Sequence, residues 1–310
     1  MRVLGLDGGG TKTAVAVADG TGRVIAMAEG PGLDPTAGDG WEARLVALVQ
    51  PFGAVDAALL GLPYFSEVPA ISARQTSVAR SVLGRGACVV NDVAVAYEGA
   101  FGGAEGVLLL SGTGSMAWAR GPAGVVRCGG WGDVFGDEGS AFWIGREALS
   151  RVSRHLDGRH RAPGLAAGIL DALGIPGAEL IEWTYSQTQP RAAIAALSRR
   201  VDALAGHDAD AADILSRAAG HLVELARAAG RVSGQSYGFG WSYAGGCFAS
   251  THLRAEVTAG MGSHPQPPRM PPVGGAVLAA ARRAGWRVDD AFINTLAASL
   301  AEKLARLETK

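Results

Sequence analysis

The first stretch whose residue types could do chemistry is the run Asp7-Gly8-Gly9-Gly10-Thr11-Lys12. Glycines lack a Cβ and so let backbone N–H groups approach phosphate oxygens, while Thr11 and Lys12 add a hydroxyl and a positive charge. Asp7 ends an apolar run, where it is a candidate to hold Mg²⁺ through water. The run is not a P-loop, because Thr11 stands where the lysine is required and a strand follows instead of a helix. On these residues alone, phosphate binding and an ordinary tight hairpin are equally well supported.

Two later glycine turns have similar chemistry. The run Ser111-Gly112-Thr113-Gly114-Ser115 combines glycines with three hydroxyl side chains, which makes a loop rich in hydrogen-bond donors. Gly245-Gly246 follows a short apolar run and would let a flat base or an α-phosphate lie close to the backbone. Cys247 beside it is interpreted as a small packing residue. A plain turn explains the first of these loops equally well until its partner loops are considered.

Acidic residues occur at two further places. Asp92 follows a buried apolar run and precedes a predicted helix, so it is a candidate general base that accepts the proton of an attacking hydroxyl. A helix N-cap is the favoured alternative for this residue taken alone. The segment 129–140 places acidic residues and glycines around Trp131, as a polar ligand loop would. Its alternative is again capping, by Asp137 or Glu138, of the helix that follows.

These residues need a scaffold, and the apolar pattern predicts one that is repeated. Strands separated by glycine turns are predicted at 2–6, 13–18 and 24–28, and the same pattern returns at 107–110, 116–120 and 125–127. The repeat predicts two related α/β lobes, 1–104 together with the C-terminal helix 286–310, and 105–285. The remaining predicted strands lie at 55–62, 88–90 and 242–244, and the predicted helices at 41–50, 74–83, 93–100, 140–156, 164–173, 192–205, 209–232, 274–284 and 290–307.

The composition excludes several classes of protein. The 310 residues contain 28 Lys and Arg against 29 Asp and Glu, without a basic cluster, which argues against a nucleic acid or an anionic membrane as partner. Hydrophobic residues make up 48%, enough to bury a large core. Three separated cysteines suit neither a disulfide framework nor a zinc site. Without a signal peptide or an apolar run of about 18 residues, a cytoplasmic location is expected.

The order of the motifs resembles that of the N-acetylglucosamine kinases and their relatives, the BadF-type ATPases. Over nearly the whole chain, DGGGTKT is followed by ND, SGTGS, CGGWGDVFGDEGSAFWIG, AGG and PPVGGAVLAA. The resemblance implies an α/β, two-lobed actin-like (ribonuclease H-like) ATPase fold with an interdomain cleft. It also implies an ATP-dependent kinase that phosphorylates the 6-hydroxyl of an amino sugar, N-acetylglucosamine above all, with ATP and Mg²⁺ as cofactors and a homodimer as the assembly.

The same resemblance implies roles for individual residues. Asp92 takes the position of the catalytic base, and Asp7 that of a magnesium ligand acting through water. The implied nucleotide-binding residues are Gly9, Gly10, Thr11, Lys12, Gly112, Thr113, Gly114, Gly245, Gly246 and Ser250. The implied sugar-binding residues are Asp34, Ser115, Met116, Gly130, Trp131, Gly132 and Asp137. A carboxylate suits such a site, because sugar hydroxyls are donors and a charged acceptor makes the stronger bond.

The sequence also departs from the family pattern, which leaves alternatives open. Met116 stands where these kinases often have Asn, Asp34 lies where an Asn usually meets the sugar, and 62–67 replaces a GLAG-like segment. Glucosamine or another hexose is therefore an alternative acceptor. An activator ATPase of a CoA-ester dehydratase or reductase is a second alternative, disfavoured because the cysteines are not closely placed for an iron–sulfur cluster. A non-catalytic sugar-binding regulator is a third, disfavoured by the intact Asp92 and phosphate loops.

Overall fold

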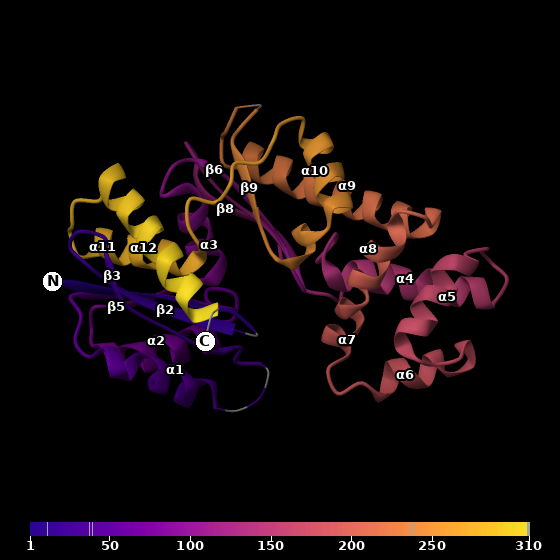
Figure 1. Cartoon of the computed structure of the whole chain (residues 1–310), viewed down its shortest axis with the longest axis horizontal. Helices are drawn as coiled ribbons and strands as arrows, with labels where there is room; N and C mark the ends of the chain where they lie inside the picture. The colour runs from indigo at the N-terminus through magenta and orange to yellow at the C-terminus, as the bar shows by residue number, and fades with distance from the viewer. Residues whose placement is uncertain (11, 37, 39, 237, 309–310) are drawn as a thin grey trace. The chain divides into compact units, whose positions relative to one another are not determined.

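The computed structural model describes residues 1–10, 12–36, 38, 40–236 and 238–308. Their contacts divide the chain into two compact units, Met1–Ala104 with Pro267–Lys310, and Glu105–Gln266. Each unit is built on its own mixed β-sheet with helices packed on it (Figure 1). The two units are referred to below as unit 1 and unit 2.

The elements follow one another in a regular α/β order. The strands are β1 (Arg2–Gly8), β2 (Lys12–Asp19), β3 (Val24–Pro31), β4 (Ala57–Leu62), β5 (Ala87–Asn91), β6 (Gly106–Ser111), β7 (Ser115–Gly121), β8 (Gly124–Gly129) and β9 (Trp241–Ala244). The α-helices are α1 (Trp41–Val49), α2 (Pro69–Leu83), α3 (Asp92–Phe101), α4 (Ala141–Leu156), α5 (Pro163–Leu173), α6 (Leu180–Ser186), α7 (Pro190–Ala196), α8 (Ser198–Ala205), α9 (Ala209–Val232), α10 (Thr251–Met261), α11 (Pro272–Arg283) and α12 (Asp290–Glu308). Short 3₁₀ segments lie at Gln50–Phe52, Gly177–Glu179 and Gly246–Ala249.

Unit 1 is a three-layer sandwich around a five-stranded sheet of order β3-β2-β1-β4-β5. The pairs β1–β2 and β2–β3 are antiparallel, whereas β1, β4 and β5 run parallel. The interior strand β4 is buried along its whole length, as its unbroken apolar sequence predicts for a parallel strand covered on both faces. One face carries a core with α3, α11 and α12, and the other a core with α1 and α2.

Unit 2 repeats the start of this topology. Its sheet has the order β8-β7-β6-β9, with β6–β7 and β7–β8 antiparallel and β6–β9 parallel. The long helix α9 buries Ile214, Ala218 and Leu222 from an apolar stripe of helical period, in one core with the inward-facing residues of β6 and β7. The repeated hairpin pattern of the sequence therefore corresponds to two sheets that begin with the same three-stranded meander.

Three parts of the chain differ from the sequence-based expectation. Residues 192–205 form two helices, α7 and α8, because the buried Leu197 sits at a turn between them. The helices α6 and α10 were not predicted at all. Residues 267–285, expected in the second lobe, pack instead with unit 1, where Val273, Ala276 and Val277 of α11 join the core that covers β1 and β4.

Helix α11 lies very close to α3 at Gly275, and this contact tests the packing of unit 1. A Cβ on Gly275 would stand 2.1 Å from the Val95 carbonyl oxygen and 2.3 Å from the Gly99 nitrogen. Because both are backbone atoms, the two helices would have to separate, so we expect Gly275→Ala to lower the free energy of unfolding by about 3 kcal/mol.

The matched control is Gly220→Ala in α9, where nothing lies within 4 Å of the added methyl group. Alanine is the better helix former, so this change should raise the free energy of unfolding by up to about 1 kcal/mol. Urea unfolding of both variants measures the contrast. Equal stabilities would contradict the close packing of α3 and α11.

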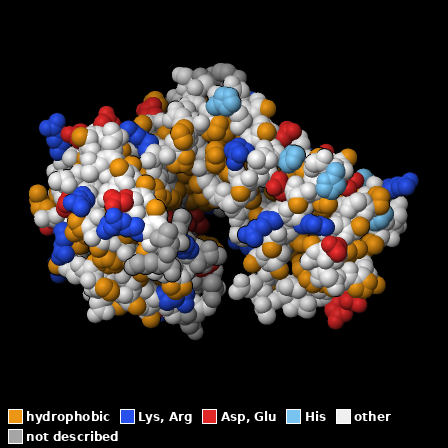
Figure 2. Space-filling view, viewed as in Figure 1, with side chains coloured by type: hydrophobic (Ala, Val, Ile, Leu, Met, Phe, Trp, Pro, Cys, Tyr) orange, Lys and Arg blue, Asp and Glu red, His pale blue; other side chains and the backbone are white. Residues whose placement is uncertain are grey.

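The distribution of charged side chains on the surface and the lengths of the apolar helices bear on possible binding partners. Lys and Arg side chains lie scattered among acidic and apolar ones on the face shown in Figure 2. Within the described residues, no single helix combines the length and apolarity needed to cross a membrane, and one bent pair, Pro163–Leu173 with Gly177–Ser186, meets the criteria by length and composition only.

Candidate functional site

The acidic residues of unit 1 gather because of the sheet topology. The parallel strands β1, β4 and β5 end at the same edge of the sheet. Asp7 lies at the end of β1, the segment 63–67 follows β4, and Asp92 follows β5 directly. Ligand sites of parallel α/β sheets lie at this carboxyl edge. Asp34 and Glu67 lie near enough to raise the pKa of Asp92 through their charges, so four carboxylates share this edge.

Asp92 is not the N-cap of α3. That position belongs to Asn91, whose Oδ1 accepts a hydrogen bond from the Val93 N–H at 3.0 Å. Asn91 also donates through Nδ2 to the Phe65 carbonyl oxygen and to Glu67 Oε1, each at 3.1 Å. Asp92 is the first helical residue, with Oδ1 2.9 Å from the same Val93 nitrogen. Because capping is already provided by its neighbour, the capping role does not explain Asp92.

Burial raises the pKa of both central carboxyl groups. It raises the pKa of Asp7 to about 7, with a further contribution from the charge of Asp92. It raises the pKa of Asp92 to about 6, in part against the hydrogen bond from Val93. Within the described residues, neither Asp7 nor Asp92 forms an ion pair. A carboxyl group with a pKa near neutrality is suited to accept a proton during catalysis.

The segment 63–67, noted in the sequence only as a departure from the family pattern, has an unusual backbone that the sequence did not predict. Tyr64 and Ser66 adopt positive φ angles of 63° and 66°, which non-glycine residues rarely do. The fully buried Gln75 of α2 donates to the Pro63 carbonyl oxygen at 2.9 Å and fixes the start of the segment. The turn places the Phe65 carbonyl oxygen and the Glu67 carboxylate where Asn91 donates to them. These hydrogen bonds hold Asn91 in place as the N-cap of α3.

The other predicted residues of unit 1 lie at or beside the β1–β2 hairpin. The carbonyl oxygen of Gly9 accepts from the Leu33 N–H at 3.0 Å, and a Cβ on Gly10 would lie 3.9 Å from Asp34. Asp34 itself accepts from the N–H and hydroxyl of Thr36, each at 2.7 Å. Lys12 pairs with Glu29 on β3 at 2.7 Å, so its charge is already engaged. Thr11 lies outside the described residues.

In unit 2 the predicted phosphate loop is the β6–β7 hairpin. Its carbonyl groups are turned toward the start of α4, because Gly112 and Thr113 accept from the N–H groups of Ala141 and Phe142. Gly112 N–H donates to the Gly114 carbonyl oxygen at 2.9 Å. Within the part of the chain that the structure describes, the N–H groups of Thr113 and Gly114 make no hydrogen bond. The hairpin therefore has two backbone donors available for an anion.

Asp137 is a buried acid next to this hairpin. Its Oδ2 lies 2.5 Å from Arg191 Nη2, and its Oδ1 accepts from the Ser115 N–H at 3.4 Å. Only 3% of Asp137 is exposed, and burial raises the pKa of its carboxyl group although the Arg191 charge acts in the opposite direction. Asp137 has a φ of 55°, and the N-cap of α4 is Ser140. Capping therefore does not account for Asp137 either.

The middle of the 129–140 segment is a loop in which Trp131, Val134 and Phe135 are exposed. Trp131 is 71% exposed and lies between Gly130 and Gly132, both with positive φ. Met116 pairs with Gly129 across β7 and β8, so it stands at the base of this loop. Ser115 donates through its hydroxyl to the Glu138 carbonyl oxygen at 2.7 Å, which ties the loop to the β6–β7 hairpin. This region thus brings together most of the residues implied in sugar binding that belong to unit 2.

The turn after β9 also lies against the β6–β7 hairpin. Gly245 has a φ of 99°, and a Cβ there would stand 2.2 Å from the Ser111 carbonyl oxygen, so only glycine fits. Gly246 begins the following 3₁₀ segment and has open space around its Cα. Ser250 is the N-cap of α10, accepting from the Leu253 N–H and bonding Asp202. Its hydroxyl is occupied by the fold, so we leave it out of the nucleotide set proposed below.

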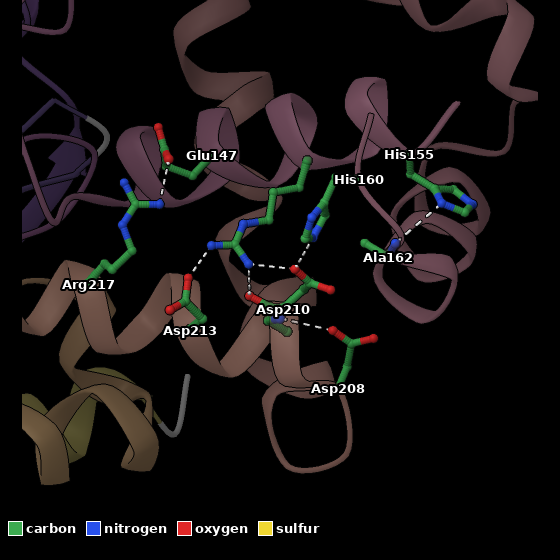
Figure 3. Close-up of polar contacts among 10 residues, drawn as sticks. Glu147, His155, His160, Ala162, Asp208, Asp210, Asp213 and Arg217 are labelled. Carbon is green, nitrogen blue, oxygen red and sulfur yellow. Dashed lines mark hydrogen bonds and ion pairs between the residues drawn. The ribbon is translucent and has the colours of Figure 1, made fainter. Parts of the chain in front are cut away.

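Another group of titratable side chains joins α4 and the segment after it to α9 (Figure 3). Arg151 donates to Asp210 at 2.6 Å and also bonds Asp213, while His160 Nε2 lies 2.7 Å from Asp210. Although burial acts against it, the hydrogen bonds from His160 and Arg151 hold the pKa of Asp210 below its usual range. The charged side chains of this group pair with one another. The group therefore has a structural role, which is to hold the residues before α5 against the first turn of α9.

Residues able to hold a metal are few. Within the described ranges, no three His, Cys, Asp or Glu side chains gather in a metal-binding arrangement. Cys88, Cys128 and Cys247 are free thiols. Asp7 fits the magnesium role in one respect: burial and the charge of Asp92 raise the pKa of its carboxyl group to about 7, and a nearby cation would favour the ionised form. Magnesium usually keeps several waters and takes one or two carboxylates together with substrate phosphates.

Comparison with known proteins places this geometry in a family. A family model described as the BadF/BadG/BcrA/BcrD ATPase family matches residues 4–280. An N-acetylmuramic acid/N-acetylglucosamine kinase from Clostridium acetobutylicum is 38% identical over 116 residues, which are 37% of this chain and 38% of that protein. The match therefore spans little more than a third of the length of this curated relative.

Two solved structures match over most of the chain. A protein assigned as an N-acetylglucosamine kinase from Chromobacterium violaceum has a TM-score of 0.72 at 28% identity, covering 89% of this chain and 98% of that one. A ROK family glucokinase from Streptomyces griseus, solved with glucose and AMPPNP, has a TM-score of 0.54 at 18% identity, covering 91% and 99%. These matches confirm the predicted actin-like sugar kinase fold. Because the family model matches most of its length, the chain belongs to the BadF/BadG/BcrA/BcrD ATPase family.

Proposed function

We propose that this ATPase-family protein is an ATP-dependent kinase that phosphorylates the 6-hydroxyl of an amino sugar, N-acetylglucosamine first. The observation that carries the proposal is the state of Asp92. Its carboxyl group has a raised pKa and lies at the carboxyl edge of a parallel sheet. It is not needed as the N-cap of α3, because Asn91 has that role. The kinases named among the relatives support the choice of an amino sugar as acceptor.

Each unit contains candidate groups of its own. In unit 1, Asp92 orients the sugar hydroxyl and accepts its proton as the oxygen–phosphorus bond forms and the bond to the β–γ bridging oxygen of ATP breaks, releasing ADP. In unit 2, the free N–H groups of Thr113 and Gly114 bind phosphate oxygens, and Gly245 and Gly246 accept the nucleotide. Asp7 would hold magnesium through water, and the ion would neutralise phosphate charge. Gly9 and Gly10 line the β1–β2 hairpin, which is the phosphate-binding candidate within unit 1.

The sugar is proposed to contact the residues near Trp131. Asp137 is oriented by Arg191 and accepts from a sugar hydroxyl, a charge-assisted bond stronger than a neutral one. Trp131 offers an exposed ring for the apolar face of a sugar. Asp34, whose side chain closes its own turn, is the acceptor proposed in unit 1.

The test is a coupled assay of ADP release with Mg-ATP and a panel of N-acetylglucosamine, N-acetylmuramic acid, N-acetylmannosamine, glucosamine and glucose. We expect ADP release to depend on an N-acetylated amino sugar, with the 6-phosphate as product by mass spectrometry. ADP release of equal rate without any sugar would contradict the kinase and favour an ATPase that drives another protein.

A further inference from the structure

Unit 2 contains a cavity of about 410 Å³ between β8 and the middle of α9. The side chains that matter for its chemistry are Arg127, Trp131, Glu138, His221, Glu224 and Leu225. All of them belong to unit 2, and the volume falls within the usual range of small-molecule sites. None of the roles assigned above uses His221, Glu224 or Leu225.

The cavity adjoins the loop proposed to bind the sugar. Trp131 belongs to both, and Glu138 follows the sugar-binding candidate Asp137 directly. Arg127 fixes the loop from inside the cavity, because its Nε donates to the Gly129 carbonyl oxygen at 3.2 Å and its Nη2 donates to that of Gly130. Its guanidinium also lies 5.8 Å from the centre of the Trp131 ring. The cavity is therefore built onto the sugar loop and is not a separate hollow.

The side chains around the cavity favour a neutral ligand with many hydroxyl groups. Within the described residues, the side chains of Glu138 and Glu224 have no hydrogen-bond or ion-pair partner, and Glu138 is half-buried. His221 packs edge-on against Trp143, with ring centres 5.1 Å apart, and has no described hydrogen bond. Carboxylates accept hydrogen bonds from the hydroxyl groups of a sugar, and an aromatic ring or the apolar Leu225 packs against its C–H groups. This combination of side chains is suited to binding a sugar ring.

The same charges disfavour an acidic ligand. Two carboxylates line the cavity beside one guanidinium, that of Arg127, which donates to loop carbonyl oxygens, and the charge of Arg231 also reaches the lining residue Cys128. A carboxylate on the ligand would meet like charges, which are costly when partly desolvated.

We propose that this cavity is a second sugar subsite, so that the preferred acceptor is an amino sugar extended by one further neutral glycosyl residue. This proposal rests on the proposed kinase function and refines its substrate class. The amino sugar that receives the phosphoryl group is held by Asp137 and its neighbours, and the added ring is held by Glu138, His221 and Glu224.

The experiment compares N-acetylglucosamine with its β-1,4-linked disaccharide in the ADP-release assay, and compares their binding by titration calorimetry. For the parent protein, we expect the disaccharide to have at least a tenfold higher kcat/KM than the monosaccharide, and a correspondingly lower Kd. Glu224→Gln and His221→Ala should abolish this advantage while changing the monosaccharide kcat/KM by less than twofold. Glu182→Gln, an exposed acid on α6 outside the cavity, is the matched control and should keep the advantage.

The outcomes separate the subsite from the kinase. If the monosaccharide is phosphorylated and the disaccharide has no advantage, or keeps its advantage in both cavity variants, the subsite is refuted and the kinase stands. A preference for N-acetylmuramic acid over the disaccharide also refutes it. If no sugar is phosphorylated, the kinase fails, and calorimetry alone decides the subsite: tighter disaccharide binding that both variants abolish supports it, and its absence refutes it.

Discussion

We expect Asp92→Asn to lose turnover by on the order of 10²- to 10⁴-fold while gaining stability at neutral pH. The loss follows because asparagine keeps the shape and the acceptor oxygen for Val93 but cannot take a proton. Sugar-dependent ADP release measures it. The parent enzyme should also lose kcat/KM as pH falls below about 6, where Asp92 becomes protonated, whereas the variant should lack this acidic limb.

The gain in stability has a definite pH window. The pKa of Asp92 is raised from 3.8 to about 6 in the folded protein, so folded Asp92 binds its proton more tightly than unfolded Asp92 does. The free energy of unfolding therefore falls as pH rises from about 4 to about 6, and the full loss persists above that range. Asn removes the loss, so the variant should exceed the parent by up to about 3 kcal/mol at pH 8 and by little near pH 4.

Asp19→Asn is the control of opposite sign. Although burial acts against it, hydrogen bonds from Thr21 hold the pKa of Asp19 below its usual range, so this substitution should lower stability at neutral pH. Full turnover of Asp92→Asn per folded molecule would contradict the role of Asp92 as base. A loss of stability at pH 8 would contradict its burial as a charged group.

Breaking the Asp137–Arg191 pair should give the second large effect. Arg191→Met leaves a carboxylate that is 3% exposed without its cation, and this should cost about 3 kcal/mol in the free energy of unfolding. Asp137→Asn removes the charge instead and should cost less. The double variant should recover at least about 1 kcal/mol relative to the sum of the two single changes, because removing both charges leaves no buried ion unpaired.

The same variants report on the sugar. Both proteins that carry the Asp137→Asn change should show a sugar KM raised by roughly 10- to 100-fold, the value of one hydrogen bond to a charged group, with the KM of ATP unchanged. Asp133→Asn is the matched control, since Asp133 lies 3.8 Å from the same arginine and is partly exposed. Additive losses in the double variant would show that the pair is not coupled, and an unchanged sugar KM would remove Asp137 from the sugar site.

The strands and turns near the candidate site could be predicted from the sequence because their signals are local. Short apolar runs between glycines predicted β1–β3 and β6–β8, and Asp92 was singled out as a candidate because it follows an apolar strand and precedes a helix. The predicted actin-like fold and the family relationship were confirmed by the comparisons.

Other features depend on contacts between distant residues, which the sequence does not display. Arg191 lies on α7, far along the chain from Asp137, and no local pattern singles it out. Capping of α3 by Asn91 and of α4 by Ser140 was not predicted, because the nearby Asp92 and Asp137 are of a residue type that caps helices equally well. The assignment of α11 to unit 1 depends on close packing at Gly275, and a glycine in sequence does not reveal what lies against it.

The discontinuity of unit 1 governs the order in which a ribosome can complete the two parts. Unit 2 is one continuous stretch, 105–266, so all of its core residues have been synthesised before α11 emerges. The sheet of unit 1 is made before unit 2, whereas α11 and α12, whose side chains cover one face of that sheet, are made after unit 2. During synthesis, Val3, Ala57 and their neighbours on that face stay exposed to water while a whole second unit is added. The nascent N-terminal sheet is therefore the stretch that a holding chaperone has most reason to bind, and unit 1 is the last to close.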